Sequence, residues 1–296
     1  MKMQNPEKQF TNWIVFIGPP NVGKSTLVNR LVGEKVSIVT PKAQTTRSSL
    51  KGIRVEGSTQ LVFIDTPGIF EAKTRNEKIL VNSAWQTVND ADEICLMLDV
   101  KKALQPKNIE LLQNIKKRRV LCNLVINKID LLPKPKLLEM IAQLNQMCDF
   151  KNIFLISALK GDGVDKLFEY FMGTALPKPW LFDEDSFTDA PLHFMVSEIV
   201  REKIIFNTHQ EVPYNVYVQT DHWEKKDNID VININIFVTT ESHKKILIGK
   251  DGGLLKRIGT QARKEIERLI NKKVYLGLHI KVIDPTRIKH PNYENK

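Results

Sequence analysis

The stretch GPPNVGKS, from Gly18 to Ser25, restricts the fold of this chain more than any other feature. It matches the pattern GxxxxGKS, in which glycines let backbone amides surround phosphates, the lysine reaches the β- and γ-phosphates and the hydroxyl binds Mg²⁺. The apolar run WIVFI precedes this loop, and the helical stretch STLVNRLVG follows it. Because strand, loop, lysine, hydroxyl and helix all agree, we expect a nucleotide-binding site rather than a chance glycine turn.

Four further apolar runs alternate with longer amphipathic stretches as far as residue 177. They are QLVFIDTPG, EICLMLDV, VLCNLVINK and NIFLISA, and GVDKLFEYFMGTAL reads as a closing helix. This alternation predicts an α/β domain over residues 1–177, with a mostly parallel sheet covered by helices on both faces.

Three short motifs follow these strands and identify the nucleotide. DTPG places Asp65 to hold Mg²⁺, through water, and the amide of Gly68 to contact the γ-phosphate. NKID offers Asp130 to the N1–H and 2-amino donors of guanine, a pair that adenine lacks. ISALK adds a backbone amide for the guanine O6. The motifs predict a GTPase whose nucleotide-binding residues are Gly18, Asn21, Val22, Gly23, Lys24, Ser25, Thr26, Asp65, Gly68, Asn127, Lys128, Asp130, Ser157 and Ala158.

The segment PKAQTTRSS lies between the first two motifs. We expect Thr46, rather than its neighbour Thr45, to join the Mg²⁺ shell only when the γ-phosphate is present, which would give an order–disorder switch. A solvated Thr-Thr turn is the alternative interpretation. The expected metal ligands are Ser25, Thr46 and Asp65, and the expected catalytic residues are Lys24, Thr46 and Gly68.

The pattern of the chain changes after residue 177. The stretch PKPWLFDEDSFTDAP is rich in proline and acidic side chains, and its residues 178–190 are interpreted as a linker. Residues 191–296 then show the order α-β-β-α-α-β, which predicts a small α+β domain with a three-stranded sheet and three helices.

A second glycine loop, ILIGKDGG, opens the long basic helix of this domain. Residues 242–273 hold 10 basic and 3 acidic side chains, in a chain of net charge +10, which indicates a polyanionic partner. I-G-x-x-G between two helices is typical of a KH domain, in which the loop clamps about four nucleotides of single-stranded RNA. Asp251 departs from the ideal pattern by placing a negative charge in the clamp. The predicted RNA-binding residues are Ile248, Gly249, Lys250, Asp251, Gly252, Lys256 and Arg257, with Leu255 and Ile258 on the core face.

GPPNVGKS, QTTR, DTPG, NKID and SAL in this order, followed by IGKDGGLLKRIGTQARKEIE, resemble the Era family over nearly the whole chain. That family joins a P-loop GTPase domain to a C-terminal KH domain, here of type II. The resemblance implies GTP-dependent assembly of the small ribosomal subunit, with the KH domain bound near the 3′ end of the small-subunit rRNA. It also implies at most a weak peripheral association with the membrane. A monomer is expected, and DNA is not expected as a partner.

GTP hydrolysis needs an oriented water and charge compensation. In Ras-like proteins a glutamine follows the glycine of DxxG, but here the position holds Ile69, whose aliphatic side chain cannot orient water. We therefore expect slow intrinsic hydrolysis. Asn21 matches a position that helps to bind K⁺ in related GTPases, and K⁺ is a possible additional cofactor beside GTP or GDP and Mg²⁺. The alternative is that Asn21 only shapes the loop.

Other features exclude several classes of protein. The cysteines Cys95, Cys122 and Cys148 are far apart and are interpreted as buried apolar residues. A polar N-terminus and the lack of a long apolar run predict a soluble cytoplasmic protein. Two alternative functions stay open at this point. One is a passive RNA-binding protein with a structural nucleotide site; the other is a GTPase of tRNA modification, which would need a catalytic cysteine or a further domain.

Overall fold

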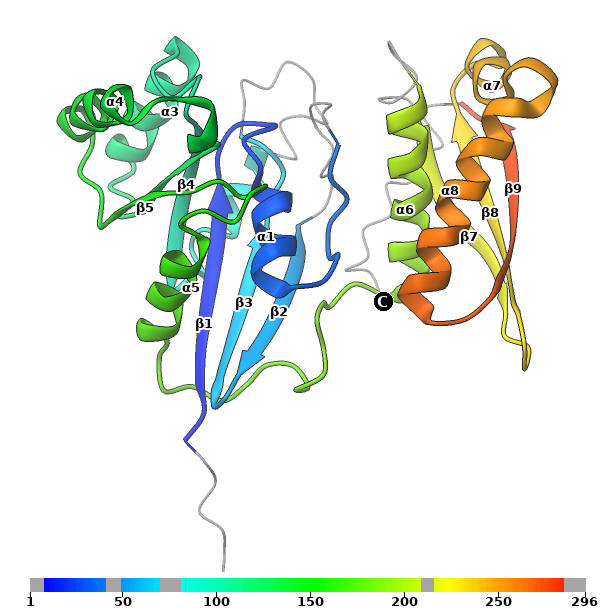
Figure 1. Cartoon of the computed structure of the whole chain (residues 1–296), viewed down its shortest axis with the longest axis horizontal. Helices are drawn as coiled ribbons and strands as arrows, with labels where there is room; N and C mark the ends of the chain where they lie inside the picture. The colour runs from blue at the N-terminus through cyan, green and yellow to red at the C-terminus, as the bar shows by residue number, and fades with distance from the viewer. Residues whose placement is uncertain (1–7, 41–48, 70–80, 83, 209–215, 285–296) are drawn as a thin grey trace, which may run out of the picture. The chain divides into compact units, whose positions relative to one another are not determined.

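The computed structural model describes residues 8–40, 49–69, 81–82, 84–208 and 216–284 (Figure 1). The chain divides into two compact units, Met1–Asp189 and Ala190–Lys296, and each is described by itself. The first contains a six-stranded, mostly parallel sheet with helices and the second a three-stranded sheet with helices, as expected from the sequence.

A six-stranded sheet with the order β2-β3-β1-β4-β5-β6 forms the centre of the first unit. Its strands are β1 (Phe10–Ile17), β2 (Leu50–Glu56), β3 (Thr59–Asp65), β4 (Glu93–Asp99), β5 (Asn123–Asn127) and β6 (Ile153–Leu155). Neighbouring strands are parallel except β2, which pairs antiparallel with β3. The sheet is thus mostly parallel, as predicted, and the antiparallel edge strand β2 is an element that the sequence analysis does not identify.

Helices cover both faces of this sheet. The helical segments are α1 (Lys24–Val32), α3 (Pro106–Lys117), the 3₁₀ turn η1 (Ile129–Leu131), α4 (Lys134–Met147) and α5 (Val164–Gly173). Successive strand residues face opposite sides. Val15 therefore joins a core with residues of α3 and α4, whereas the Phe16 ring packs with the rings of Phe63 and of Phe171 in α5, at centroid distances of 6.3 and 6.2 Å.

Because the strands are mostly parallel, their carboxyl ends lie together on one side of the sheet and their amino ends on the other. The loop before α1 follows β1, Asp65 ends β3 and Asn127 ends β5, so these groups converge at the carboxyl edge. Ligands bind at this edge in open α/β sheets.

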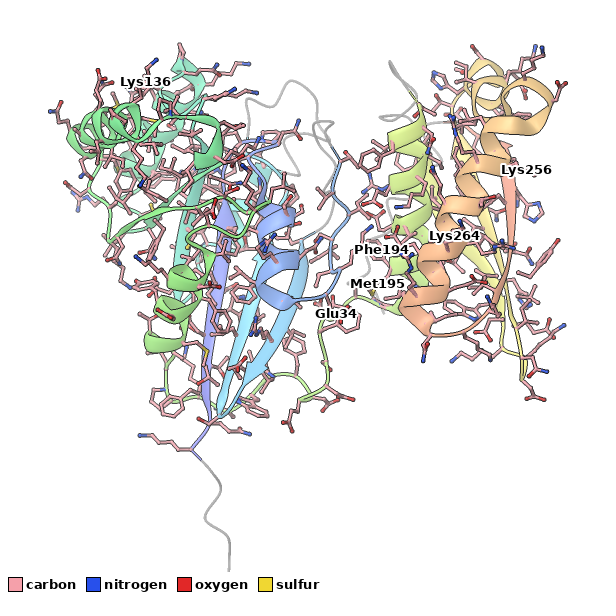
Figure 2. The ribbon with its side chains drawn as sticks, viewed as in Figure 1. Glu34, Lys136, Phe194, Met195, Lys256 and Lys264 are labelled. Atoms are coloured by element: carbon pink, nitrogen blue, oxygen red, sulfur yellow. The ribbon has the colours of Figure 1, made fainter. Side chains whose placement is uncertain are left out.

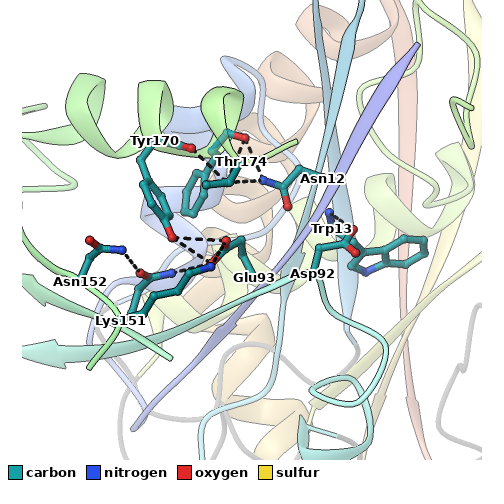
Figure 3. Close-up of polar contacts among 10 residues, drawn as sticks. Asn12, Trp13, Asp92, Glu93, Lys151, Asn152, Tyr170 and Thr174 are labelled. Atoms are coloured by element: carbon teal, nitrogen blue, oxygen red, sulfur yellow. Dashed lines mark hydrogen bonds and ion pairs between the residues drawn. The ribbon is translucent and has the colours of Figure 1, made fainter. Parts of the chain in front are cut away.

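The opposite, amino edge carries a buried polar network (Figure 3). The carboxylate of Glu93 accepts from Asn123 Nδ2 at 2.8 Å and from Lys151 Nζ at 2.5 Å, and Tyr170 Oη lies 3.3 Å away. The bond to Glu93 raises the pKa of Lys151. Since a buried carboxylate is costly without partners, this network fixes the starts of β4 and β5 and holds α5 to the sheet.

Of the predicted linker, residues 178–190, all but the last residue belong to the first unit and are bound to it. Trp180 Nε1 donates to Ser58 O at 3.1 Å, and Gln60 Nε2 donates to Phe182 O at 2.8 Å. Thr188 then forms an antiparallel bridge with Gly52 on β2. We call residues 178–189 the strap; within it, Phe187 and Thr188 bond to Ile53 and Gly52 of β2 and so extend the free edge of the sheet.

The second unit begins after the strap and has the predicted order α-β-β-α-α-β. Its elements are α6 (Leu192–Asn207), β7 (Val216–Glu224), β8 (Asp230–Val238), α7 (Glu241–Ile248), the 3₁₀ turn η3 (Lys250–Gly252), α8 (Gly253–Ile270) and β9 (Val274–Val282). The strand β8 pairs antiparallel with β7 and parallel with β9. Alternate residues of β8, among them Ile232, Ile234 and Ile236, are fully buried against α6 and α8.

All three cysteines are buried, as expected. Burial raises the pKa of the Cys122 thiol to about 12 and also raises the pKa of Cys95 and Cys148. Because the thiolate is the reactive form, none of them is suited to nucleophilic chemistry. Within the described ranges, no helix is both long and apolar enough to span a membrane.

Candidate nucleotide site and nucleic-acid interface

The loop between β1 and α1 adopts a backbone shape that only glycine permits at two positions. Gly18 has φ +148°, and a Cβ there would lie 2.3 Å from Met97 O. Gly23 has φ +101°, and a Cβ there would lie 2.4 Å from Asn127 Nδ2. Asn21 also has positive φ, at 62°. The loop thus lies close to the neighbouring strand ends and leads directly into the N-terminus of α1, the end of a helix that favours phosphate groups.

Lys24 is the first residue of α1 and is buried. Its Nζ donates to Gly18 O and Pro19 O, each at 3.0 Å. Burial lowers its pKa to about 8, and the nearby carboxylate of Asp65 opposes this shift. A buried ammonium of this kind would gain strongly from a multiply charged anion, so the side chain fits a phosphate group.

Ser25 and Asp65 bring two oxygen ligands together beside Lys24. Ser25 Oγ donates to Asp65 Oδ2 at 2.6 Å. Mg²⁺ prefers oxygen ligands and commonly uses one or two protein groups together with substrate phosphates. The pair therefore fits Mg²⁺, although no cluster of three or more His, Cys, Asp or Glu side chains occurs in the part of the chain that the structure describes.

The DTPG loop is attached to the phosphate loop. The amide of Ile69 donates to Gly18 O at 2.8 Å. A Cβ on Gly68 would lie 2.7 Å from Pro20 N, so this close approach also requires glycine. The side chain of Ile69 is only 8% exposed and packs with Ala84 in the core. The position of the water-orienting glutamine in Ras-like proteins is therefore used here for packing.

The NKID motif is held in place by contacts with the phosphate loop. Asn127 Nδ2 donates to Val22 O at 2.7 Å, and Lys128 Nζ donates to Asn21 O at 2.8 Å and to Asp99 Oδ2 at 2.6 Å. Lys128 has φ 65°, which turns the chain sharply after β5. These bonds fix the base-reading motif relative to the phosphate loop.

Asp130 lies in η1 and has two partners in the SAL loop, residues 157–161. A hydrogen bond from Ser157 is the main cause that lowers the pKa of Asp130, and the positive charge of Lys160, 3.7 Å away, adds to it. Asp130 is therefore ionised at neutral pH and can accept two hydrogen bonds from a base.

The amide of Ala158 has a partner within the protein. It donates to Asn127 Oδ1 at 2.8 Å. In this arrangement the amide orients Asn127, and it could reach a guanine O6 only by sharing its proton between two acceptors.

Two side chains on α1 that the sequence analysis does not select also shape the site. Arg30 donates from Nε to Ala158 O and from Nη2 to Leu159 O, both at 2.6 Å. Asn29 Oδ1 accepts from the amides of Val36 and Ser37, each at 2.9 Å. Asn29 thereby fixes the chain after α1. The polar pair Asn-Arg inside an otherwise amphipathic helix is the only sequence signal for these contacts. Thr45 and Thr46 lie outside the described residues.

The second glycine loop has the left-handed backbone expected of a clamp. Gly249, Asp251 and Gly252 have φ values of 72°, 52° and 74°. A Cβ on Gly249 would lie 2.7 Å from Leu254 Cβ, whereas nothing lies within 4 Å of a Cβ on Gly252. Gly249 is therefore needed for packing, while Gly252 leaves open space for a ligand.

The charged groups of this loop are at the surface. Lys250, Asp251, Lys256 and Arg257 are all exposed, and Lys256 and Lys264 are two cations along α8 (Figure 2). Ile258 is fully buried and Leu255 is partly buried against the core, as expected. The loop thus presents glycine backbone and cations together, which is the combination that binds a sugar–phosphate chain.

Comparison with known proteins agrees with both domains. Residues 13–128 match the family described as 50S ribosome-binding GTPase, and residues 211–287 match the KH domain family. The GTPase Era of a Bradyrhizobium species (strain BTAi1) is 43% identical over 288 residues, which cover 95% of this chain and 94% of that protein. The chain belongs to the Era GTPase family. GTPase Era of Agrobacterium fabrum is 40% identical over 96% of this chain and 92% of its own length.

Solved structures of Era have the same architecture. A crystal structure of Era in complex with MgGDPNP and nucleotides 1506–1542 of 16S ribosomal RNA has a TM-score of 0.89 at 38% identity, covering 96% of this chain and 97% of that chain. A point variant of Aquifex aeolicus Era bound to GDP·AlF₄⁻ matches with the same TM-score, identity and coverage. This chain is therefore a GTPase that carries a KH domain.

Proposed function

We propose that this GTPase is a molecular switch that binds the 3′ region of the small-subunit rRNA through its KH domain and assists maturation of the small ribosomal subunit. One observation carries the proposal. A single chain holds a nucleotide site with a buried lysine beside a hydroxyl–carboxylate pair, and a glycine clamp with exposed cations. The Era structure solved with MgGDPNP and 16S rRNA nucleotides supports the choice of both ligands.

In the proposed nucleotide site, α1 and its loop bind the phosphates and the NKID and SAL motifs bind the base. Lys24 would contact the β- and γ-phosphates, the Gly68 amide would contact the γ-phosphate, and Asp130 would accept from guanine. Ser25, Asp65 and Thr46 would hold Mg²⁺, which neutralises charge between the two outer phosphates when it is bound. The remaining phosphate-loop contacts come from backbone amides of Gly18, Asn21, Val22, Gly23 and Thr26.

Hydrolysis in this site lacks a glutamine to orient water, since Ile69 is buried in the core. We propose that intrinsic turnover is slow and that a monovalent cation near Asn21 supplies positive charge during phosphoryl transfer. Asn21 lies in the phosphate loop, with its carbonyl held by Lys128.

The strap bonds to β2 at Thr188 and leads along the chain into the KH unit. Lys51 is the second residue of β2, the strand that follows the segment containing Thr46. Its Nζ lies 2.7 Å from Asp189 Oδ2, and its amide donates to Asp189 Oδ1 at 3.2 Å. Asp189 is also the last residue before the KH unit. We propose that a nucleotide-dependent change around Thr46 alters this strand and strap, and with them the RNA affinity of the KH domain.

RNA affinity measured with a non-hydrolysable GTP analogue, with GDP and without nucleotide tests this coupling. At one fixed salt concentration, we expect the affinities to differ by the equivalent of about 1–3 kcal/mol between nucleotide states. Asp189→Asn should reduce the difference while leaving GDP affinity unchanged. Lys178→Met, which removes the ion pair with Asp92 at the other end of the strap, is the matched control. Identical affinities in all states of the wild type would mean that the two domains are only tethered.

The RNA target is tested by sequencing the RNA that co-purifies with the chain. We expect enrichment of the 3′ end of small-subunit rRNA, and loss of this enrichment with Gly252→Asp. Enrichment of tRNA instead would refute the assignment. We also propose that the protein acts as a monomer in the cytoplasm on the small ribosomal subunit, with at most weak peripheral association with the membrane.

A further inference from the structure

Arg30 joins the two ends of the nucleotide site. It lies in the last turn of α1, the helix whose first residues are Lys24 and Ser25. Its guanidinium donates two hydrogen bonds of 2.6 Å to successive carbonyls of the SAL loop, those of Ala158 and Leu159. One helix therefore holds the phosphate-binding groups at its start and the base-reading loop at its end.

The SAL loop has an open position for this guanidinium. Gly161 has φ +100°, and a Cβ there would lie 2.8 Å from Arg30 Nη1. The loop is closed by bonds from the Gly161 amide to Ser157 O at 2.7 Å and from the Lys160 amide to Ser157 Oγ at 3.2 Å. Arg30 thus contacts a compact turn from its outer side.

The contact with Arg30 determines where the amides of this turn point. The peptide bonds are trans, so each N–H points away from the carbonyl of its own peptide group. Since Arg30 holds the Ala158 carbonyl, the Leu159 N–H faces away from Arg30. Within the described part of the chain, the Leu159 amide donates to no other group, whereas the amides of Ala158 and Lys160 are both used.

We propose that Arg30 is a positioning residue for base selectivity. It holds the SAL loop so that the Leu159 amide is presented to the carbonyl oxygen of guanine and Ser157 stays bonded to Asp130. This inference rests on the proposed guanine site. Arg30 itself is exposed, so its replacement should cost little stability and should change selectivity instead.

The test measures the dissociation constants of GDP, IDP, 6-thio-GDP and ADP for Arg30 variants of the full chain. IDP lacks the 2-amino group that Asp130 would bind, and 6-thio-GDP replaces the base oxygen by a weaker acceptor. For Arg30→Ala we expect about tenfold weaker GDP binding than in the wild type. The factor by which IDP and 6-thio-GDP bind more weakly than GDP should be smaller in this variant than in the wild type. Arg30→Lys keeps the positive charge but cannot donate to both carbonyls with the fixed geometry of a guanidinium. Its GDP affinity should lie between those of the wild type and Arg30→Ala.

Arg54→Ala is the matched control. Arg54 also donates to a main-chain carbonyl, that of Leu31 at 3.0 Å, but does not contact the SAL loop. It should leave the ratios between nucleotides unchanged. The inference is wrong if Arg30→Ala leaves the dissociation constant of GDP unchanged, or if it raises the dissociation constants of all four nucleotides by the same factor. A wild type that does not prefer GDP over ADP would instead refute the guanine site itself, independently of Arg30.

Discussion

Raising the pH from about 7.5 to about 8.5 should weaken GDP binding, because Lys24 loses its proton in the nucleotide-free protein. Burial lowers the pKa of this lysine from 10.5 to about 8, whereas a bound diphosphate would raise it again. The charged form is therefore the one that binds. The nucleotide contributes little to this dependence, because a phosphate monoester has its second pKa near 6.

The magnitude follows from the fraction of Lys24 that is protonated before binding. With a pKa of about 8, this fraction falls from about three-quarters to about one-quarter over the interval, so GDP affinity should fall about threefold. At the higher pH, binding should take up about three-quarters of a proton. Calorimetry in two buffers of different ionisation enthalpy measures this uptake directly. Constant affinity together with no proton uptake would refute the assignment of a low pKa to Lys24.

The same shift predicts how the stability of the nucleotide-free protein depends on pH. The pKa is lower in the folded state than in the unfolded state, so below pH 8 the buried ammonium destabilises the fold by about 3 kcal/mol. This cost disappears as the pH rises from 8 towards 10.5. Lys24→Met removes the buried charge, which stabilises the fold, but it also removes the hydrogen-bond donor to the Gly18 and Pro19 carbonyls, which opposes that gain. It should abolish nucleotide binding and raise the unfolding free energy at neutral pH by about 1–2 kcal/mol, as measured by urea denaturation.

Three further predictions concern the base, the cation and the RNA clamp. Asp130→Asn exchanges one acceptor for a donor, so it should lose GTP affinity and gain affinity for xanthosine triphosphate; unchanged GTP affinity would contradict the base-reading role. GTP turnover should be faster in K⁺ than in Na⁺ at matched ionic strength if Asn21 binds a monovalent ion, and Asn21→Ala should remove the difference; equal wild-type rates in the two salts would exclude this role. Gly252→Asp should abolish RNA binding in a filter-binding assay and leave GTP affinity unchanged; it should lower the stability of the KH domain by only about 1 kcal/mol, because φ is +74° there but nothing lies within 4 Å of the added Cβ. Gly249→Ala should instead destabilise the KH domain by about 1–3 kcal/mol through its clash with Leu254, and a stable Gly249→Ala protein would show that this loop tolerates a side chain.

The amino-acid sequence by itself determined the features that depend on local backbone geometry. GPPNVGKS and IGKDGG are continuous stretches, and each specifies positive φ and close backbone approach within a few residues. The apolar runs likewise specified five of the six strands. Four of them are central strands, which burial on both faces makes visible as hydrophobic runs, and the fifth, the edge strand β6, also has an apolar run, IFL. β2 has no such run, since LKGIRVE lies at the edge of the sheet and alternates apolar with charged residues.

Only the tertiary structure decided the contacts between segments distant in sequence. Arg30 and Ala158 are 128 residues apart, and Lys51 and Asp189 are 138 residues apart. Nothing in the composition of RLVG or FDEDSFTD distinguishes such residues from solvated surface charges, because an exposed arginine or aspartate is compatible with almost any local backbone. Their roles arise when the sheet brings the end of α1 to the SAL loop and the strap to β2. Chain folding, rather than motif, therefore determines how the nucleotide site is held together.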